Sequence, residues 1–427
     1  MKISDIRVTP IAIGDPPLLN AAGLHAPYAL RTIVEVVSDD GLYGLGEVPG
    51  SAAITAALEA AAAIVVGCDP FHLNVIEQAL VKRFVHDAPA HGEAAWDKRR
   101  VSAVFSAIEV ACYDLIGKAI GRPVCDLLGG RVRDRVPFSA YLFYKYEGAG
   151  GALEFACDPS ATGWAAARQA AALDPDGIVR QAQAMCAEFG FQSIKLKGGV
   201  MPPDEEVAAI AALRQAFGAQ MPLRLDPNAI WSVETSVRCG RNLEGLLEYY
   251  EDPVRGQANM AVVGKSVNLP LATNMCTTSF DDLPGSIQLG SEQIILSDHH
   301  FWGGLAASVQ LARICRTFGR GLSMHSNSHV GISLMAMAHL AASVPNLTYA
   351  CDTHYPWQSD EVLVGGRRLF DDGCIVIADA PGLGIELDRA ELAQLHHAYL
   401  AAGLTERNDE VEMQKVQPGW VFQPVRW

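Results

Sequence analysis

Two lysines stand one residue apart in the apolar stretch FQSIKLKGGV, residues 191–200. Alternate residues of a β-strand point to the same face, so Lys195 and Lys197 are expected to project together. The apolar residues around them and the glycine pair that follows indicate a central strand rather than an edge strand. A neighbouring positive charge disfavours protonation. Lys195 is therefore expected to lower the pKa of Lys197, to prepare it as a base, and to help neutralise a bound anion.

Oxygen-bearing side chains close three later apolar segments. Asp226 ends LRLD, Glu251 lies near the end of LEYYED, and Asn274 ends LPLATN. Each carboxylate alone could merely cap the helix that follows, but three such groups together, with no Cys or His, suit a hard octahedral cation such as Mg²⁺. Asp252 could replace Glu251, because alternation along the segment does not decide which of the two points inward.

A candidate acid/base pair follows farther along the chain. Asp298 ends IILSD, and His325 lies near the end of GLSMHS. An aspartate beside a histidine holds the imidazole in one tautomer and raises its basicity. If these residues stand across the metal from Lys197, the metal lies between two candidate bases.

Eight short apolar segments, alternating with amphipathic helices, would position these groups. They are VPFSAYLF, SIKLK, LRLD, LEYYED, LPLATN, IILSD, GLSMHS and LTYACD. A polar residue closes seven of them in succession, from Lys197 to Asp352, at intervals of about 25 residues, which is the length of one strand, one helix and two loops. The pattern predicts a TIM-type (β/α) barrel with its chemistry at the carboxyl ends of the strands.

Three regions are expected along the chain. Residues 1–130 combine β-type segments, of which TIVEVVSDDGLYGLGEV turns at Asp40-Gly41, with the helical stretch VFSAIEVACYDLIGKAIG, and so predict an α+β domain. Residues 131–390 form the α/β barrel that carries the metal and acid/base residues. Residues 391–427 form a helix and a tail that are expected to pack back on the first domain.

Composition narrows the possible functions. The formal net charge is −15 and there is no basic run, which argues against nucleic acid as a partner but allows a small anionic substrate. No uncharged apolar run reaches about 18 residues, and the N-terminus is typical of a strand rather than a signal sequence, so we expect a cytoplasmic protein without a membrane partner. The ten cysteines form no CxxC pair and are expected to be reduced core thiols.

With these residues the sequence resembles the enolase superfamily, in its mandelate racemase-like branch, and most closely the glucarate dehydratases. The matching stretches run nearly end to end: GLHAPY, AYLF, IKLKGGV, LDPNAIWS, EDP, LPLATNM, LSDHHFWGG, MHSNSHVGISL, DTHYPWQ, PGLGIEL and LTERNDEVEMQ. The resemblance implies an α+β capping domain over a modified barrel. It assigns Mg²⁺ to Asp226, Glu251 and Asn274, and it implies Lys197 as one base and the His325–Asp298 pair as the other.

The same resemblance implies further contacts. Asn228 would lie close to the metal and the substrate, and five residues would contact a polyhydroxy diacid: His25, Tyr141, Ser326, His354 and Arg407. Each of these five would otherwise be read as an ordinary loop, core or surface residue. Members of the family are commonly symmetric assemblies, so a homo-oligomer is expected.

Two segments depart from the glucarate dehydratase pattern. Residues 86–100, HDAPAHGEAAWDKRR, lack the expected glycine-rich stretch with a threonine and carry Ala94-Ala95 in its place. The stretch VRGQANM after the fourth strand lacks a further glutamate, so Glu251 must serve as the ligand. Both departures concern which acid sugar is bound and leave the predicted barrel chemistry in place.

The expected reaction is removal of the proton α to a carboxylate by Lys197 or His325, followed by loss of the β-hydroxyl, with His325 as the acid, to give a 2-keto-3-deoxy acid. Within the family, the alternative is a racemase, epimerase or dehydratase for another acid sugar, such as galactarate or a monoacid. Outside it, a Schiff-base aldolase would also use a barrel lysine, and a third alternative is an inert protein that only binds a ligand.

Overall fold

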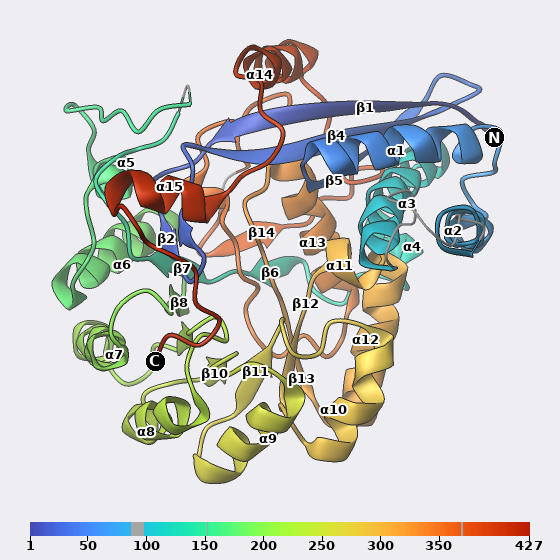
Figure 1. Cartoon of the computed structure of the whole chain (residues 1–427). Helices are drawn as coiled ribbons and strands as arrows, with labels where there is room; N and C mark the ends of the chain where they lie inside the picture. Colours follow the sequence, from blue (N-terminus) through green and yellow to red (C-terminus); the bar gives the residue numbers. More distant parts are fainter. Residues whose placement is uncertain (87–97, 152, 369) are drawn as a thin grey trace.

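The computed structural model describes residues 1–86, 98–151, 153–368 and 370–427. Its N-terminal region is an antiparallel sheet of order β1-β4-β5 with helices packed against it (Figure 1). The elements are β1 (Ile3–Gly14), β4 (Tyr28–Ser38), β5 (Tyr43–Pro49), α1 (Ala52–Val65), α2 (Leu73–Val81) and α3 (Lys98–Ile120). This region confirms the expected α+β fold of the cap.

Local sequence explains these elements. The predicted hairpin turn is confirmed: Gly41 has a φ of +86°, which suits glycine, and its N–H donates to the Ser38 carbonyl between β4 and β5. Ser51 begins α1 by accepting a hydrogen bond from the Ile54 N–H over 3.2 Å. The helical stretch predicted at residues 104–121 is confirmed as part of α3, whose apolar residues at spacings of three and four are fully buried against the sheet.

Seven parallel strands form the curved sheet of the barrel, in the order β13-β12-β11-β10-β9-β8-β7. They are β7 (Ala140–Phe143), β8 (Ile194–Lys197), β9 (Leu223–Asp226), β10 (Tyr249–Glu251), β11 (Leu271–Thr273), β12 (Ile294–Ser297) and β13 (Gly321–Met324). Helices cover the outside, as in other parallel sheets. These helices are α6 (Pro175–Phe189), α7 (Pro203–Phe217), α8 (Val233–Leu243), α9 (Gln257–Ser266), α10 (Leu283–Leu289), α12 (Leu305–Thr317) and α13 (Gly331–Ser343). The short helix α11 (His299–Trp302) follows β12 and packs against α3 of the cap.

The predicted eighth strand, LTYACD at residues 347–352, is wrong as a regular strand. Within the described residues this segment makes only a single parallel bridge, between Cys351 and Phe138, next to β7. On its other side the Asp352 N–H donates to the Met324 carbonyl of β13 over 2.9 Å. The segment still closes the gap between the first and last strands, and the chain is a modified TIM barrel.

The irregularity has a local cause. The N–H groups of Thr348 and Tyr349 both donate to the Leu322 carbonyl, at 3.1 and 3.3 Å. Two successive donors on one acceptor break the regular pairing of a parallel ladder. The apolar pattern of this segment indicated burial correctly, but it carried no information on this register break.

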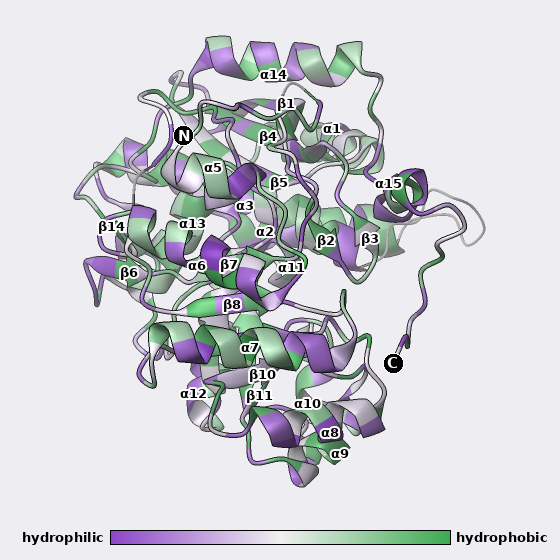
Figure 2. Cartoon of the chain, turned by 90° about the vertical axis from the view of Figure 1, so that its left-hand side faces the viewer, coloured by the Kyte–Doolittle hydropathy of each residue, from purple (hydrophilic) through white to green (hydrophobic). Residues whose placement is uncertain are grey.

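The predicted first strand, VPFSAYLF at residues 136–143, is divided in two. Its beginning belongs to β6 (Arg135–Pro137), which pairs antiparallel with β14 (Cys374–Val376), and its end is β7 in the barrel. The shorter elements are β2 (Leu19–Asn20), β3 (Gly23–Leu24), α4 (Val124–Leu127), α5 (Gly163–Gln169), η1 (Lys82–His86), η2 (Phe280–Asp282) and η3 (Tyr355–Trp357). Figure 2 shows hydrophilic and hydrophobic residues mixed along outer helices such as α7.

The C-terminal segment forms α14 (Arg389–Ala401) and α15 (Asp409–Val416). Helix α14 lies across β1 of the cap, at the top of Figure 1. The final residues reach the barrel: Ser232 N–H donates to the Trp427 carbonyl over 2.5 Å, and Arg426 N–H to the Ile230 carbonyl over 2.9 Å. The tail therefore contacts barrel loops as well as the cap.

All ten cysteines are free. Among the described residues, no helix has the length and apolar character needed to cross a membrane.

Candidate active site

Lys197 lies at the carboxyl end of β8, where its ammonium group is held by the neighbouring strand. Its Nζ donates to Asp226 Oδ2 and to Asn228 Oδ1, each over 2.6 Å. Asn228 adopts a left-handed backbone conformation, with φ +60°, and its N–H donates to Asp226 Oδ1 over 2.9 Å. The turn after β9 thus fixes the Asp226 carboxylate opposite Lys197. The structure brings together Lys197, Asp226 and Asn228, all of which were predicted site residues.

The predicted lowering of the Lys197 pKa is wrong for this structure. Burial lowers the pKa, and the charge of Lys195 acts in the same direction, as the sequence suggested. Asp226, Tyr141 and Glu251 together outweigh both, so the pKa of Lys197 is raised above its ordinary value. The sequence pattern identified the like charge but not the opposite charge 2.6 Å away.

Lys195 is fully buried one residue earlier on the same strand. Its Nζ lies 2.7 Å from Glu251 Oε1 and 2.7 Å from Asp352 Oδ2, and 4.7 Å from the centre of the Tyr141 ring. Burial lowers the pKa of Lys195, but Asp352 and Glu251 together raise it well above its ordinary value. Lys195 therefore remains a cation that neutralises two buried carboxylates.

One of the predicted magnesium ligands has a buried oxygen without a protein partner. Within the described residues, the buried Oδ1 of Asn274 accepts no hydrogen bond, and Glu251 Oε2 has only the ion pair with Lys195 Nζ, at 2.6 Å. Buried acceptors without partners are uncommon, and amide and carboxylate oxygens suit Mg²⁺.

Burial and the nearby Asp226 raise the pKa of Glu251. The pKa of Asp226 is about 2, because the two lysines outweigh its burial. The residues present fit a divalent cation.

The structure distinguishes Glu251 from Asp252, which the sequence left open. Glu251 faces Lys195, whereas Asp252, at φ +36°, turns toward the next strand. Asp252 Oδ2 accepts the Asn274 N–H over 2.9 Å, and Oδ1 accepts the hydroxyl of Thr273. Burial and the charge of Asp226 raise the pKa of Asp252 to about 7. Asp252 thus positions the backbone of Asn274, while Glu251 is the available ligand.

His325 and Asp298 form the predicted pair, with His325 Nδ1 lying 2.9 Å from Asp298 Oδ2. A second histidine, which the sequence analysis did not identify, shares the same carboxylate: His300 Nδ1 lies 2.7 Å from Asp298 Oδ1, and His300 Nε2 lies 2.9 Å from Ser333 Oγ. Burial raises the pKa of Asp298, but the two histidines outweigh it and hold the pKa well below the ordinary value. In the sequence, the two histidines that follow Asp298 in SDHH were the only indication that a second histidine could reach this carboxylate.

Three of the predicted substrate contacts cluster beside Lys195. The rings of Tyr141 and His354 lie 4.7 Å apart, centre to centre, and the His354 N–H donates to Ser326 Oγ over 3.2 Å. Burial lowers the pKa of His354 well below its ordinary value, and nearby cationic groups add to the shift. His354 is therefore neutral and can accept or donate one hydrogen bond at each nitrogen according to its tautomer.

The other two predicted contacts share a buried aspartate. His25 Nδ1 lies 2.8 Å from Asp15 Oδ2, and Arg407 Nη1 donates to the same oxygen over 3.3 Å. Arg407 Nε lies 2.8 Å from Asp409 as well. Both Arg407 and His25 are thus held by acidic side chains of the cap and the C-terminal segment.

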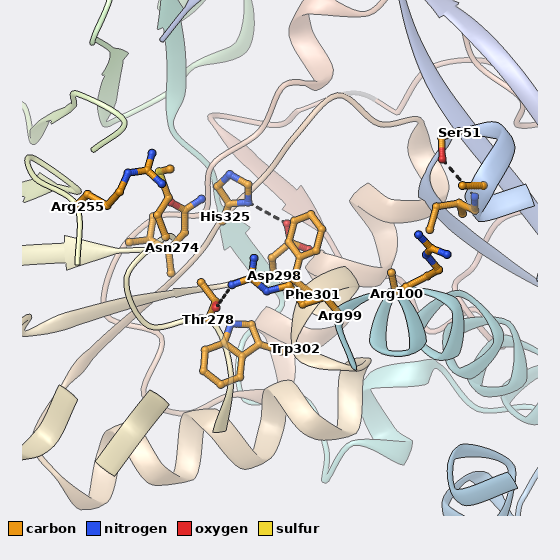
Figure 3. A pocket seen from close by; sticks show the side chains of 15 residues that line it. Ser51, Arg99, Arg100, Arg255, Asn274, Thr278, Asp298, Phe301, Trp302 and His325 are labelled. Atoms are coloured by element: carbon orange, nitrogen blue, oxygen red, sulfur yellow. Dashed lines mark hydrogen bonds and ion pairs between the residues drawn. The ribbon is translucent and has the colours of Figure 1, made fainter. Parts of the chain in front are cut away.

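A cavity of about 660 Å³ opens between the cap and the barrel, next to the acid/base pair (Figure 3). Asn274, Asp298 and His325 line its barrel side. Arg99, Arg100 and Arg255 also line it, and none of the three was expected from the sequence. Its remaining wall includes the apolar side chains Ile54, Ala103, Met275, Leu296, Phe301 and Trp302. The predicted specificity segment with Ala94-Ala95 lies outside the described residues.

Two family models match the chain. The model described as mandelate racemase / muconate lactonizing enzyme, N-terminal domain, matches residues 21–129, and the model described as enolase C-terminal domain-like matches residues 177–391. The first covers the cap and the second most of the barrel.

Relatives match over nearly the whole length. A probable glucarate dehydratase from Streptomyces coelicolor is 47% identical over 439 residues, covering 100% of this chain and 99% of that protein. A solved enolase structure from Pseudomonas fluorescens Pf0-1, with bound magnesium, potassium and tartrate, is 48% identical with a TM-score of 0.90, covering 99% of this chain and 98% of that one. Another, from Thermobispora bispora with magnesium and formate, is 50% identical with a TM-score of 0.90, covering 98% of each chain.

Proposed function

The chain belongs to the enolase superfamily, in its mandelate racemase-like branch near the glucarate dehydratases, and we propose that it is a magnesium-dependent dehydratase of acid sugars. One observation carries the proposal. In the strand order of the barrel, β8 with Lys197 and β13 with His325 stand on either side of β9, β10 and β11, whose ends carry the oxygen ligands. A substrate carboxylate bound at those ligands would have a candidate base on each side.

Each residue of the candidate site then has a defined role in the reaction. Lys197, once it has lost its own proton, or His325 takes the proton from the carbon next to the carboxylate, and the choice depends on the configuration at that carbon. Asp298 holds His325 through Nδ1, so that Nε2 remains for proton transfer. Protonated His325 then donates to the departing β-hydroxyl, which leaves as water, and the remaining enol becomes the 2-keto-3-deoxy acid. Mg²⁺, held by Asp226, Glu251 and Asn274, would offset the negative charge that develops on the carboxylate.

Epimerisation at C2 is the second candidate function. It is favoured by the same pair of bases, because a proton removed by one can be returned by the other on the opposite face. The two functions differ only in whether the β-hydroxyl leaves before the proton returns.

The test is a screen of acid sugars in D₂O with Mg²⁺, followed by NMR and by assay of 2-keto-3-deoxy products. We expect one or a few acid sugars to yield such a product. Lys197→Ala should abolish α-proton exchange for one C2 epimer, and His325→Asn should abolish it for the other. Exchange and epimerisation without product would indicate the second candidate. Borohydride trapping of a substrate on the protein would indicate an aldolase, and the complete absence of exchange would overturn the proposal.

A further inference from the structure

Three arginines line the cavity that adjoins His325, in a chain whose formal net charge is −15. Arg99 and Arg100 lie in the first turn of α3 in the cap, and Arg255 lies in the loop between β10 and α9 of the barrel. The only acidic residue that lines this cavity among the described residues is Asp298, which is already bonded to two histidines. The cavity is therefore locally cationic.

The contacts of Arg99 and Arg255 leave donors available. Arg99 Nη2 donates to Thr278 Oγ1 over 3.1 Å, a neutral partner, and this bond joins the cap to the barrel. Arg255 has no ion-pair partner in the part of the chain that the structure describes. Figure 3 shows Arg255 beside Asn274 and Arg99 close to Thr278, on the walls around His325. A guanidinium group binds a carboxylate through two parallel hydrogen bonds, so this wall suits a carboxylate.

The other cations near the predicted site are already paired. Lys195 is held by Glu251 and Asp352, and Arg407 by Asp15 and Asp409. A second carboxylate would have to compete with these acids for Lys195 or Arg407, but it would meet no such competition at Arg255. The apolar side chains of Ile54, Phe301 and Trp302 exclude water from part of the cavity, which strengthens a charge-assisted hydrogen bond.

We infer that Arg255 and Arg99 form the subsite for the second carboxylate of a dicarboxylic acid sugar. The inference rests on the proposed function, since it supposes that the first carboxylate binds at Asp226, Glu251 and Asn274. A cavity of about 660 Å³ is within the usual range for small-molecule sites and accommodates a six-carbon diacid. Arg255 and Arg99 are then specificity-determining residues of this chain.

The experiment compares a matched pair of substrates, glucarate and gluconate, which differ only in whether C6 is a carboxylate. We expect Arg255→Gln and Arg99→Gln each to lower kcat/KM for glucarate about tenfold or more and to leave the value for gluconate unchanged within about twofold. Arg255→Lys and Arg99→Lys, which keep the positive charge, should retain part of the preference for glucarate over gluconate. Arg316→Gln, an exposed change on the outer helix α12, is the control and should alter neither substrate. Circular dichroism should show that all variants are folded.

A binding measurement gives a readout that does not need turnover. Calorimetric titration with glutarate, which cannot be dehydrated, should show a Kd at least tenfold higher in Arg255→Gln than in wild type, whereas butyrate should bind both alike. If Arg255→Gln and Arg99→Gln lowered kcat/KM equally for glucarate and gluconate, or lowered neither value, the inference would be overturned. A glucarate-selective loss in Arg407→Gln with none in Arg255→Gln would also overturn it. If the wild type exchanges the α-proton of no acid sugar, the proposed function fails, and the glutarate titration still decides whether the arginines bind a diacid.

Discussion

Lys195 and Lys197 project from the same face of β8 and share Asp226, whose Oδ2 lies 3.6 Å from Lys195 Nζ and 2.6 Å from Lys197 Nζ, but their other partners differ. Lys195 is fully buried between Glu251 and Asp352, whereas Lys197 is bonded to Asp226 and retains slight exposure. Two similar side chains therefore have different surroundings: Lys195 neutralises buried acids, and Lys197, which is slightly exposed, is one of the two proposed bases.

Replacing these lysines should affect stability unequally. Lys195→Met leaves two buried carboxylates without their shared cation, and breaking a buried pair in this way costs about 3–5 kcal/mol of unfolding free energy. Lys197→Met should cost less, because Asp226 keeps the Asn228 N–H as a donor. Urea unfolding at pH 7 measures both. Equal destabilisation by the two changes would show that the lysines are not separated in this way.

Chelation should remove activity, and Mg²⁺ should restore it. Mg²⁺ should also raise the unfolding temperature of the wild type, since a ligand at 100 times its Kd adds about 2.7 kcal/mol to the unfolding free energy. Asn274→Ala and Asp226→Asn should reduce this increase, because each removes a proposed ligand. Differential scanning calorimetry with and without Mg²⁺ provides the comparison. Turnover that persists in excess chelator would contradict the metal site.

His300 should position Asp298 for His325. His300→Gln removes the ring nitrogen that lies 2.7 Å from Asp298 Oδ1 and frees Ser333 from its contact with His300 Nε2. We expect the α-proton exchange that depends on His325 to slow about tenfold, in the range found for residues that orient site groups from behind. Exchange at the other C2 epimer, which depends on Lys197, should be nearly unchanged. A similar loss for both epimers would indicate a general structural defect instead.

Glu109 should make the protein less stable as the pH rises. It is buried on α3, where it accepts the N–H groups of Leu305 and Ala306 over 2.8 and 2.9 Å, and burial raises its pKa to about 8. Between pH 4.5 and 8 the unfolded chain has lost this proton while the folded chain retains it. Stability therefore falls through that window, by up to about 1.4 kcal/mol per pH unit for one proton, and levels off above it.

Glu109→Gln should remove this contribution. The fall in unfolding free energy from pH 5 to pH 8, measured by urea unfolding, should be smaller in the variant than in the wild type, although the variant also loses one backbone hydrogen bond. An identical fall in both proteins would show that Glu109 is not protonated in the folded state.

The sequence by itself determined the repeating architecture and the position of most candidate groups within it. Alternation placed Lys195 and Lys197 on one face because successive side chains of any strand point to opposite sides. Asp226, Asn274 and His325 follow apolar strands, and the carboxyl ends of parallel strands meet at one end of a barrel. These inferences needed only local periodicity and a rule of topology.

Only the tertiary structure decided which groups face each other. The separation of Glu251 from Asp252 depends on a left-handed backbone conformation after β10, and the raised pKa of Lys197 depends on a carboxylate 29 positions away in the chain. His300 reaches Asp298 because α11 begins at that aspartate, and Arg99 of the cap and Arg255 of the barrel line one cavity. Such pairings are set by packing between distant segments, to which the local pattern of residues is insensitive, and the electrostatics of the site follows from them.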